Sequence, residues 1–348
     1  MRYKRAAAAA TLLLAMSSAH AQDDAAARGL FSSNDVLEVR VIAPFDVIAR
    51  ERPVDEYLPG KLQYAGDDGE LVELDVGIRA RGRYRRRPNV CSFPPLRLNF
   101  KKSQTKETVF AGQDKLKLVT HCSTGSYLYQ QAIIAEYLTY RILNTLSDKS
   151  FRVRLLKIHY ANADDEGGID SHAILIEHKN DLAKRIGAAP LEVQKTTVDS
   201  LEPDYLNLSS VFQYLIGNTD FSPIVGSPGG NCCHNHTLFG QEGQPYYSIP
   251  YDFDMSGLIS APHAQPNPKL RLESVQERLY RGRCVNNERL PGTLELFAEK
   301  RSDIEALIRG QAELSPAKRR DMLGYINDFY RTISRPKSVE RHFVRKCK

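Results

Sequence analysis

Apolar and polar residues alternate along much of the first 120 residues of the chain. Alternation of this kind, together with frequent β-branched side chains, is typical of strands that bury one face. The predicted strands are 36–49, 70–83, 96–102 and 115–119. This part of the chain is therefore expected to be mostly β-structure.

The pattern changes at Ser126, where apolar residues begin to recur every three or four positions. This spacing predicts an amphipathic helix of about 20 residues. Ser315 followed by Pro316 is typical of the start of another helix. The remaining predicted elements are strands at 152–160 and 172–178 and helices at 206–217, 293–309 and 317–333. This order favours two units that meet at a cleft, a β-rich unit over 35–178 with one long helix and an α-rich unit over 179–348.

The N-terminus has the pattern of a secretory signal peptide. A basic start with Arg2, Lys4 and Arg5 precedes a short apolar run, and the sequence AHA at 19–21 fits a cleavage site. Residues 1–21 are the predicted signal peptide, and 22–34 are a polar, Ala-rich, flexible segment. The apolar run is shorter than the roughly 20 residues that a spanning helix needs. We therefore expect an exported protein, periplasmic or secreted, without a transmembrane helix.

Composition places the chain among ordinary folded proteins rather than disordered or membrane-spanning ones. Hydrophobic residues make up 42% of the chain and charged residues 26%. The formal net charge is +6, from 48 Lys and Arg against 42 Asp and Glu, and it falls to about +3 after signal cleavage. A net charge of this size identifies no partner by itself.

All six cysteines lie beyond the predicted signal peptide. They favour disulfides, because exported proteins fold in oxidising compartments. The adjacent Cys232 and Cys233 are expected to pair with other cysteines rather than with each other, and Cys284 is a candidate partner. A zinc site is not favoured, since the paired C-x2-C spacing is absent.

Four side chains with hard oxygen atoms lie between residues 217 and 257, namely Asp220, Asn235, Asp252 and Asp254. Carboxylates beside apolar strand residues are costly unless they bind a cation or hydrogen-bond donors. Mg²⁺ takes one or two carboxylates and completes its shell with substrate phosphates, and a further Asp can accept a hydroxyl proton during phosphoryl transfer. The alternative is that Asp220 and Asp252 cap helices and turns.

Lys115 and Lys117 lie on a predicted strand that precedes the helix carrying Glu136. Because side chains alternate along a strand, both lysines face one side while leucines face the other. A lysine that faces a cleft and is steadied by a helix carboxylate suits the binding of phosphates. The alternative is that both lysines lie on an exposed, solvated face.

Arginines are concentrated at positions 79 to 87. Alternating arginines on a strand would present one basic face, which suits phosphate or carboxylate oxygens. The stretch from Arg79 to Arg87 is therefore a candidate contact for nucleotide phosphates, an acidic protein or an envelope polyanion. The alternative is a solvated edge strand. Nucleic-acid binding is not expected, because no stacking aromatic pattern interleaves the basic residues.

Three histidines, His121, His234 and His236, are candidates for metal or general-base chemistry. His234 and His236 would project to the same side of a strand, but no third ligand stands at a recognisable spacing. The chain has no G-x-S-x-G sequence. Nothing in the sequence therefore predicts a Ser-His-Asp hydrolase.

Several of these stretches occur in one order, namely IRARGRYR, PPLRLNFKK, KLKLV, YLYQQAIIAEYL, ILIEHKNDLAKR, FQYLIGNTD, HNHTLF and IPYDFDMSG. In this order they resemble the spore coat protein H (CotH) kinase family, a set of atypical secreted or surface protein kinases. The resemblance covers roughly residues 70–260, and its most specific part is GN-x-D paired with P-aromatic-D-x-D-x-x-G. It implies an α+β, divergent two-lobed protein-kinase-like fold with a β-rich N-terminal lobe and an α-rich C-terminal lobe.

The resemblance also implies a reaction, the transfer of the γ-phosphate of ATP to Ser or Thr of proteins with Mg²⁺ or Mn²⁺. It implies Asp220 as the catalytic base and Asp252 as the principal Mg²⁺ ligand. Asp254 and Asn235 are the implied assisting ligands.

The nucleotide itself is assigned to other residues by the same resemblance. Lys117 is the implied contact to the ATP phosphates, with Lys115 as its substitute and Glu136 as the helix partner. Arg81 lies in the loop implied to cover the phosphates. Glu177 lies at the implied hinge, where backbone would meet adenine.

The chain departs from the family pattern in two places. The sequence RGRYR begins at Arg81 where the family has a small polar stretch, and an insertion occupies 221–233. ATP is also scarce outside the cytoplasm. A second function therefore stays open, a catalytically inactive kinase-like envelope binding or assembly protein that uses the Arg-rich surface. The protein substrate or envelope partner is not identified by the sequence.

Overall fold

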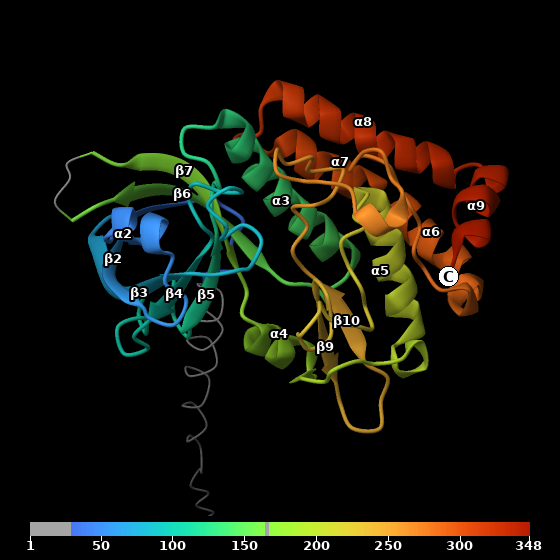
Figure 1. Cartoon of the computed structure of the whole chain (residues 1–348), viewed down its shortest axis with the longest axis horizontal. Helices are drawn as coiled ribbons and strands as arrows, with labels where there is room; N and C mark the ends of the chain where they lie inside the picture. The colour runs from blue at the N-terminus through green and yellow to red at the C-terminus, as the bar shows by residue number, and fades with distance from the viewer. Residues whose placement is uncertain (1–28, 164–166) are drawn as a thin grey trace, which may run out of the picture.

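The computed structural model describes residues 29–163 and 167–348 (Figure 1). The predicted signal peptide lies outside the described residues, as does most of the segment 22–34. The described end of that segment lies against the fold, with Leu30 buried. The Arg154 guanidinium donates to the carbonyl oxygens of Leu30 at 3.4 Å and of Ser33 at 2.8 Å.

Seven strands close into a β-barrel in the order β1-β2-β3-β4-β5-β7-β6 (Figure 1). Their bounds are β1 Leu37–Ile42, β2 Leu58–Ala65, β3 Leu71–Ala80, β4 Leu96–Phe100, β5 Lys115–Val119, β6 Val153–Ala161 and β7 Ile169–Ile176. All neighbouring pairs are antiparallel except β1 and β6, which run parallel with Leu37 opposite Leu156. This parallel pair joins the first strand to the sixth and closes the barrel.

The predicted strand 36–49 is wrong in its second half. Strand β1 ends at Ile42, and residues Phe45–Glu51 form helix α2. Pro44 precedes this helix, and Phe45 and Ile48, three residues apart, are its buried side chains. A spacing of three is helical, so the apolar run that follows β1 belongs to a different periodicity. Strand β2 was not predicted, since Pro59 and Gly60 interrupt its pattern.

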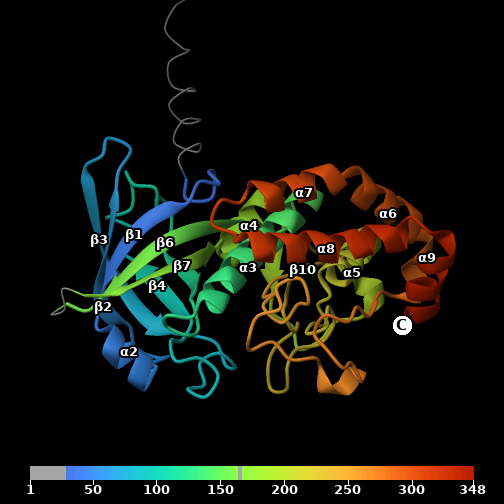
Figure 2. The same ribbon diagram turned by 90° about the horizontal axis from the view of Figure 1, so that it is seen from above.

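Helices, loops and a small sheet form the rest of the molecule. In Figure 2, α3 lies between the barrel and the other long helices. The helices are α3 Tyr127–Leu146, α4 Lys179–Ile186, α5 Pro203–Ile216, α6 Leu290–Glu299, α7 Arg301–Gly310, α8 Pro316–Ile333 and α9 Pro336–His342. A small sheet has the order β10-β9-β8, with β8 Ala189–Leu191, β9 His236–Gly240 and β10 Tyr247–Pro250. The predicted start of α8 is confirmed, because the Ser315 hydroxyl accepts from the Lys318 N–H at 3.1 Å. The predicted helix 293–309 is two helices that meet at Lys300.

The expectation of a two-lobed kinase-like fold is wrong. The strands form a closed barrel, and the helices are not a separate lobe. Strands β6 and β7 are buried on both faces, with Leu156 and Leu175 in the barrel interior and Leu155 and Ile174 in the core that includes α3 and the later helices. These two strands therefore belong to two hydrophobic cores, one on each face, and they join the barrel to the helices.

Three cysteine pairs lie at disulfide distance, Cys91 with Cys122, Cys232 with Cys233, and Cys284 with Cys347. The expectation that Cys232 and Cys233 pair with other cysteines and not with each other is therefore wrong, and so is the candidate pairing of Cys284 with either of them. The C-terminus runs beside residue 284, where the Cys284 N–H donates to the Lys348 carbonyl at 3.1 Å, and this brings Cys347 into reach. The disulfides fit the predicted export. Within residues 29–163 and 167–348, no helix has both the length and the apolar character needed to cross a membrane.

Candidate functional site

A cavity of about 380 Å³ lies where the loop after β3 faces the segments that follow α5 and β10. The family resemblance implied nine site residues, and six of them line this cavity, namely Arg81, Lys117, Asp220, Asn235, Asp252 and Asp254. A second cavity of about 410 Å³ shares Lys117 and Tyr251 with the first, and Lys115 and Glu177 line it. Residues more than 170 positions apart in sequence therefore meet at one site.

Strand β5 carries Lys117 into both cavities. Leu116 and Leu118 point into the barrel core, so Lys117 faces the opposite side. Burial, and next the charge of Arg81, lower the pKa of Lys117 to about 7. Its ammonium lies 4.3 Å from the centre of the Tyr251 ring. Within the described residues this ammonium has neither a hydrogen bond nor an ion pair, so it is a cation without an anionic partner.

Arg81 follows β3 and lines the same cavity. Its backbone N–H donates to the Pro95 carbonyl at 2.8 Å, which fixes the start of the loop. Burial lowers the pKa of Arg81, and the charge of Asp252 acts in the opposite direction. The Arg81 Nε is buried without a hydrogen-bond partner in the described part of the chain. The barrel therefore presents two incompletely partnered cations, Arg81 and Lys117, to the cavity.

The segment after β10 supplies two carboxylates, and Phe253 anchors it between them. The Phe253 ring is fully buried, with its centre 4.6 Å from that of Tyr140 and 5.4 Å from that of Phe212. The Asp252 N–H donates to the Tyr140 hydroxyl at 2.9 Å. With Phe253 fixed in the core, Asp252 and Asp254 on either side of it line the cavity.

Asp252 and Asp254 differ in how they are held. Burial, and next the charge of Asp254, raise the pKa of Asp252 to about 6. No hydrogen bond or ion pair reaches the Asp252 carboxylate from any described residue. The Asp254 Oδ2, in contrast, lies 3.0 Å from His263 Nε2 and 3.5 Å from an Arg85 guanidinium nitrogen. Although burial opposes it, the His263 hydrogen bond and the Arg85 charge lower the pKa of Asp254.

Glu136 lies behind Asp254 rather than beside Lys117. It projects from α3 into a small pocket that Arg85 and His263 also line. Burial, and next the charge of Asp254, raise the pKa of Glu136 to about 8. Glu136 therefore interacts with Asp254 and Arg85, and no ion pair between Glu136 and Lys117 is present among the described residues.

Asp220 is the most fully fixed carboxylate of the cavity. It follows Gly217, the left-handed residue that ends α5, and its N–H donates to the Asn218 Oδ1 at 2.9 Å. Its Oδ1 lies 2.8 Å from His234 Nε2, and the Asn235 side-chain amide donates to its Oδ2 at 3.1 Å and to its carbonyl at 2.7 Å. Asn235 thus holds Asp220 in place through the Asn235 Nδ2. The Asn235 Oδ1 is left for a metal ion.

Arg281 fixes the backbone around Asp220 from the other side. One of its guanidinium nitrogens donates to the carbonyls of Thr219 and Phe221, each at 2.7 Å. The sequence did not identify Arg281 or His263 as site residues, and it included Arg85 only as a member of the basic stretch from Arg79 to Arg87. No local motif marks them, because each reaches the site only through the tertiary fold.

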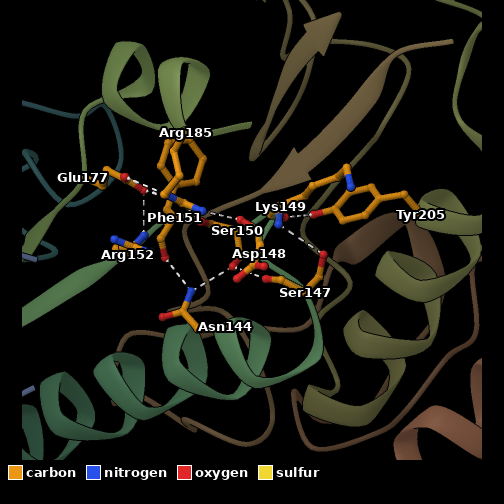
Figure 3. A network of polar contacts seen from close by, with 10 residues as sticks. All are labelled: Asn144, Ser147, Asp148, Lys149, Ser150, Phe151, Arg152, Glu177, Arg185 and Tyr205. Atoms are coloured by element: carbon orange, nitrogen blue, oxygen red, sulfur yellow. Dashed lines mark hydrogen bonds and ion pairs between the residues drawn. The ribbon is translucent and has the colours of Figure 1, made fainter. Parts of the chain in front are cut away.

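Glu177 lines the second cavity and belongs to a network of polar contacts (Figure 3). Its Oε2 accepts from Arg185 at 2.8 Å and from the Arg152 N–H at 3.0 Å. Arg185 also donates to the Ser150 carbonyl at 2.6 Å, so the pair ties β7 and α4 to the end of α3. The Glu177 carboxylate is therefore occupied by the protein, and only its position beside the cavity relates it to a ligand.

The arginine stretch does not form one basic face. Arg79 donates to the Val54 carbonyl and stacks over Tyr57, while Arg85 donates to the Thr120 carbonyl at 2.6 Å. Arg81, Arg83 and Arg85 line the cavity. The exposed members are Arg83 and Arg87. The candidate polyanion contact from Arg79 to Arg87 is thus reduced to a few exposed side chains at the mouth of the cavity.

The donor set suits a metal ion only together with a ligand. Among the described residues, no group of three or more His, Cys, Asp or Glu side chains is arranged to hold a metal. His236 is buried and bonded to Ser248, so it does not pair with His234. Within the described residues, the Asp252 carboxylate has no hydrogen bond or ion pair. The two contacts of Asp254 are both made by its Oδ2, so its Oδ1 is free for a metal ion. Two carboxylates fit Mg²⁺, which completes its shell with phosphate oxygens and water.

No protein-family model matches the chain, and no curated protein matches it.

Proposed function

We propose that the cavity binds a nucleoside triphosphate with Mg²⁺ and transfers its terminal phosphoryl group to a Ser or Thr hydroxyl of an exported protein. The observation that carries this proposal is the charge arrangement of one cavity. Arg81 and Lys117, which form no ion pair with any described residue, line it together with the free carboxylate of Asp252 and the fixed carboxylate of Asp220. Phosphoryl transfer needs such a set, because its catalysis consists of positioning and charge stabilisation.

The cations of the barrel bind the phosphates in this proposal. Arg81 offers a planar fork that suits phosphate oxygens, and Lys117 a compact charge. Because Lys117 is partly neutral near pH 7 in the free protein, a bound phosphate would draw it into its charged form. The second cavity, which shares Lys117 and Tyr251 with the first, provides room for the remainder of the nucleotide.

The carboxylates serve the reacting end. When Mg²⁺ is bound, it would neutralise the charge of the terminal phosphates, and Asp252 and Asp254 are the residues that would hold it, with the Asn235 Oδ1. Asp220 orients the acceptor hydroxyl and receives its proton, directly or through His234. The hydrogen bonds from His234, Asn235 and Arg281 keep Asp220 in one position, so little reorganisation is needed during the reaction.

The motif resemblance to the spore coat protein H kinases points to the same chemistry, and membership of that family is part of the proposal. The resemblance rests on GN-x-D and P-aromatic-D-x-D-x-x-G, whose aspartates converge on the cavity. The loop RGRYR differs from the family pattern. Here it contributes Arg81 to the cavity and Arg85 to the support of Asp254.

The test is transfer of isotope from γ-labelled ATP, with Mg²⁺ or Mn²⁺, to the oxidised protein and to added acceptor proteins. We expect Asp220→Asn and Asp252→Ala to reduce transfer on the order of a hundredfold or more. Asp303→Asn is the matched control, since Asp303 pairs with Lys300 on the exposed face of α7. Equal transfer by all four folded proteins, or none by the unmodified protein, would contradict the proposal.

A second candidate is an envelope binding or assembly protein without catalytic activity. It is favoured by one observation, the exposed Arg83 and Arg87 on the loop beside the cavity. Such a protein would bind an acidic partner or a polyanion in a salt-dependent way and would transfer no phosphoryl group at any metal concentration.

A further inference from the structure

A chain of hydrogen bonds joins a serine hydroxyl to the fixed carboxylate of the cavity. The Ser227 Oγ lies 2.7 Å from His234 Nδ1, and His234 Nε2 lies 2.8 Å from Asp220 Oδ1. All three residues line the 380 Å³ cavity. Ser227 belongs to the insertion 221–233, so this arrangement is a feature of this chain's own loop.

The hydrogen bonds define the tautomer that His234 takes when its imidazole is neutral. A carboxylate only accepts hydrogen bonds, so the proton between Asp220 and His234 is on Nε2. The Nδ1 of a neutral imidazole then has its lone pair free and accepts the hydrogen bond from the Ser227 hydroxyl. A hydroxyl hydrogen-bonded to an imidazole that a carboxylate orients is the arrangement of an activated nucleophile. These roles are set by geometry and not by the position of the residues in the sequence.

The charged residues across the cavity from Ser227 indicate which electrophile the site would accept. Arg81 and Lys117 face the cavity as cations, and Asp252 is a free carboxylate suited to a metal–phosphate complex. A neutral acyl group would leave these charges without partners, whereas a phosphoryl group pairs with them. The cavity therefore favours transfer of a phosphoryl group to Ser227.

We propose that Ser227 is an activated nucleophile that takes the terminal phosphoryl group of the bound nucleoside triphosphate and becomes phosphoserine. This inference rests on the proposed function for its donor. The Ser227 Oγ forms a bond to the γ-phosphorus as the bond from that phosphorus to the β–γ bridging oxygen breaks, and the nucleoside diphosphate leaves. The hydroxyl proton moves to His234 Nδ1, and Asp220 stabilises the imidazolium.

A second serine of the same insertion provides a matched control. The Ser222 hydroxyl accepts from the Val225 N–H at 3.2 Å and from the Ile224 N–H at 3.5 Å. It contacts no imidazole in the described structure, and it does not line the cavity. Ser222 and Ser227 thus share a loop and a side chain but differ in the group that would activate them.

The first experiment incubates the oxidised protein with ATP and Mg²⁺ and locates phosphate by peptide mass spectrometry. We expect phosphate on Ser227 in the unmodified protein and in Ser222→Ala, none at this position in Ser227→Ala, and about a hundredfold slower modification in His234→Ala. Transfer to other residues or to an added acceptor, with Ser227 unmodified, would overturn the inference and leave the proposed function standing.

The second experiment omits the nucleotide and uses a fluorophosphonate, which modifies activated serines as fluoride leaves. Ser227 is expected to react in the unmodified protein and in Ser222→Ala, and about a hundredfold more slowly in His234→Ala. If Ser227 reacts with this probe while ATP transfers nothing, the nucleophile is supported and the proposed kinase activity is refuted. If folded protein shows reaction at Ser227 with neither reagent, the inference is refuted.

Discussion

The two walls of the cavity hold their charged groups in opposite ways. On the wall built by the residues after α5, Asp220 has hydrogen bonds to His234 and Asn235 and a backbone clamped by Arg281. On the barrel wall, Lys117 has a ring contact and burial but no anionic partner among the described residues. The charged group of one wall has its partners within the protein, whereas Lys117 on the other wall has no anionic partner among the described residues.

This difference indicates that the barrel wall would supply the binding energy and that the wall with Asp220 would position the reacting groups. A carboxylate fixed by several hydrogen bonds is already in position and loses little entropy in the reaction. The desolvation cost of a buried cation is already part of the free protein. The attraction between this cation and a phosphate then contributes mostly to binding. Substitutions on the two walls should therefore affect different measurements, binding on the barrel wall and turnover on the other.

The largest effect is expected where the carboxylate segment is anchored to the core. Phe253→Ala removes a fully buried ring from contact with Tyr140 and Phe212 and should reduce the free energy of unfolding by about 3–5 kcal/mol. Because Asp252 and Asp254 flank Phe253, nucleotide binding should weaken as well. Urea denaturation and equilibrium binding measure the two effects.

The matched control for Phe253→Ala is Phe110→Ala in the barrel interior. Phe110 is equally buried and packs on Tyr64 and Phe100, away from the cavity. It should lose similar stability, while nucleotide affinity measured under folding conditions stays near that of the unmodified protein. Equal loss of affinity in both variants would show that the anchoring of the two carboxylates is not specific to Phe253.

The next effect separates two lysines of one strand. Lys117→Met should weaken nucleotide binding about a hundredfold, because it removes a desolvated cation from the phosphate-binding wall. Lys115→Met is the control, since Lys115 is exposed and lines only the second cavity. Isothermal titration with ATP and Mg²⁺ should find the Lys115 variant within about threefold of the unmodified protein. Similar losses in both would mean that general basic charge, and not the position of Lys117, governs binding.

The strand pattern was sufficient to predict β5 over its full length and to place both lysines on one face. It was not sufficient to distinguish Lys117 from Lys115, because the difference arises from Tyr251 and Arg81, which come from other parts of the chain. The alternating pattern of β3 and β4 was likewise enough to identify these strands. Local periodicity therefore predicted the elements. Which side chains face the cavity depends on tertiary contacts between distant parts of the chain.

The closure of the barrel could not be predicted in the same way. It depends on the parallel pairing of β1 with β6, strands separated by more than 100 residues. The sequence did contain one relevant signal, since residues 173–176, AILI, are apolar at successive positions and not only at alternate ones. That pattern indicates a strand buried on both faces, which here joins the barrel interior to the helical core.

Site residues fall into the same two groups. Asp220, Asp252 and Asp254 were found because short motifs carry them, and these motifs end up at one cavity. Ser227 was missed, because its contact with His234 depends on the path of the inserted loop and not on a spacing in the sequence. A motif search therefore identifies residues that a local turn positions, and it does not identify those that meet across a loop.

A smaller effect concerns the pH dependence of nucleotide binding. Burial sets the pKa of Lys117 at about 7 in the free protein, and a bound phosphate should raise it, because the phosphate favours the ammonium form. Binding above pH 7 then requires uptake of a proton, so affinity should fall as the pH rises from 7, by up to about tenfold per pH unit. The charged groups that act on Lys117 are Arg81, Asp252, Arg97 and Lys179.

Titration between pH 7 and 9 isolates this effect from Asp252, whose pKa of about 6 lies below the range. Lys117→Met should bind weakly but with an affinity that changes little over these pH values. A fall in affinity of the same steepness in Lys117→Met would assign the titration to another group and remove Lys117 from the phosphate-binding wall.

The smallest effects are expected at the exposed arginines beside the cavity. Arg83→Ala and Arg87→Ala should each change the free energy of unfolding by less than about 0.5 kcal/mol, since both side chains are exposed. Arg83 also lines the cavity, so Arg87→Ala is the variant expected to leave nucleotide affinity within about twofold. Arg85→Ala is the contrasting variant, because Arg85 holds Asp254 and the Thr120 carbonyl. If instead the pair of exposed substitutions removes salt-sensitive binding to lipopolysaccharide vesicles, and the unmodified protein transfers no phosphate, the outer surface of the loop and not the cavity would be the functional site.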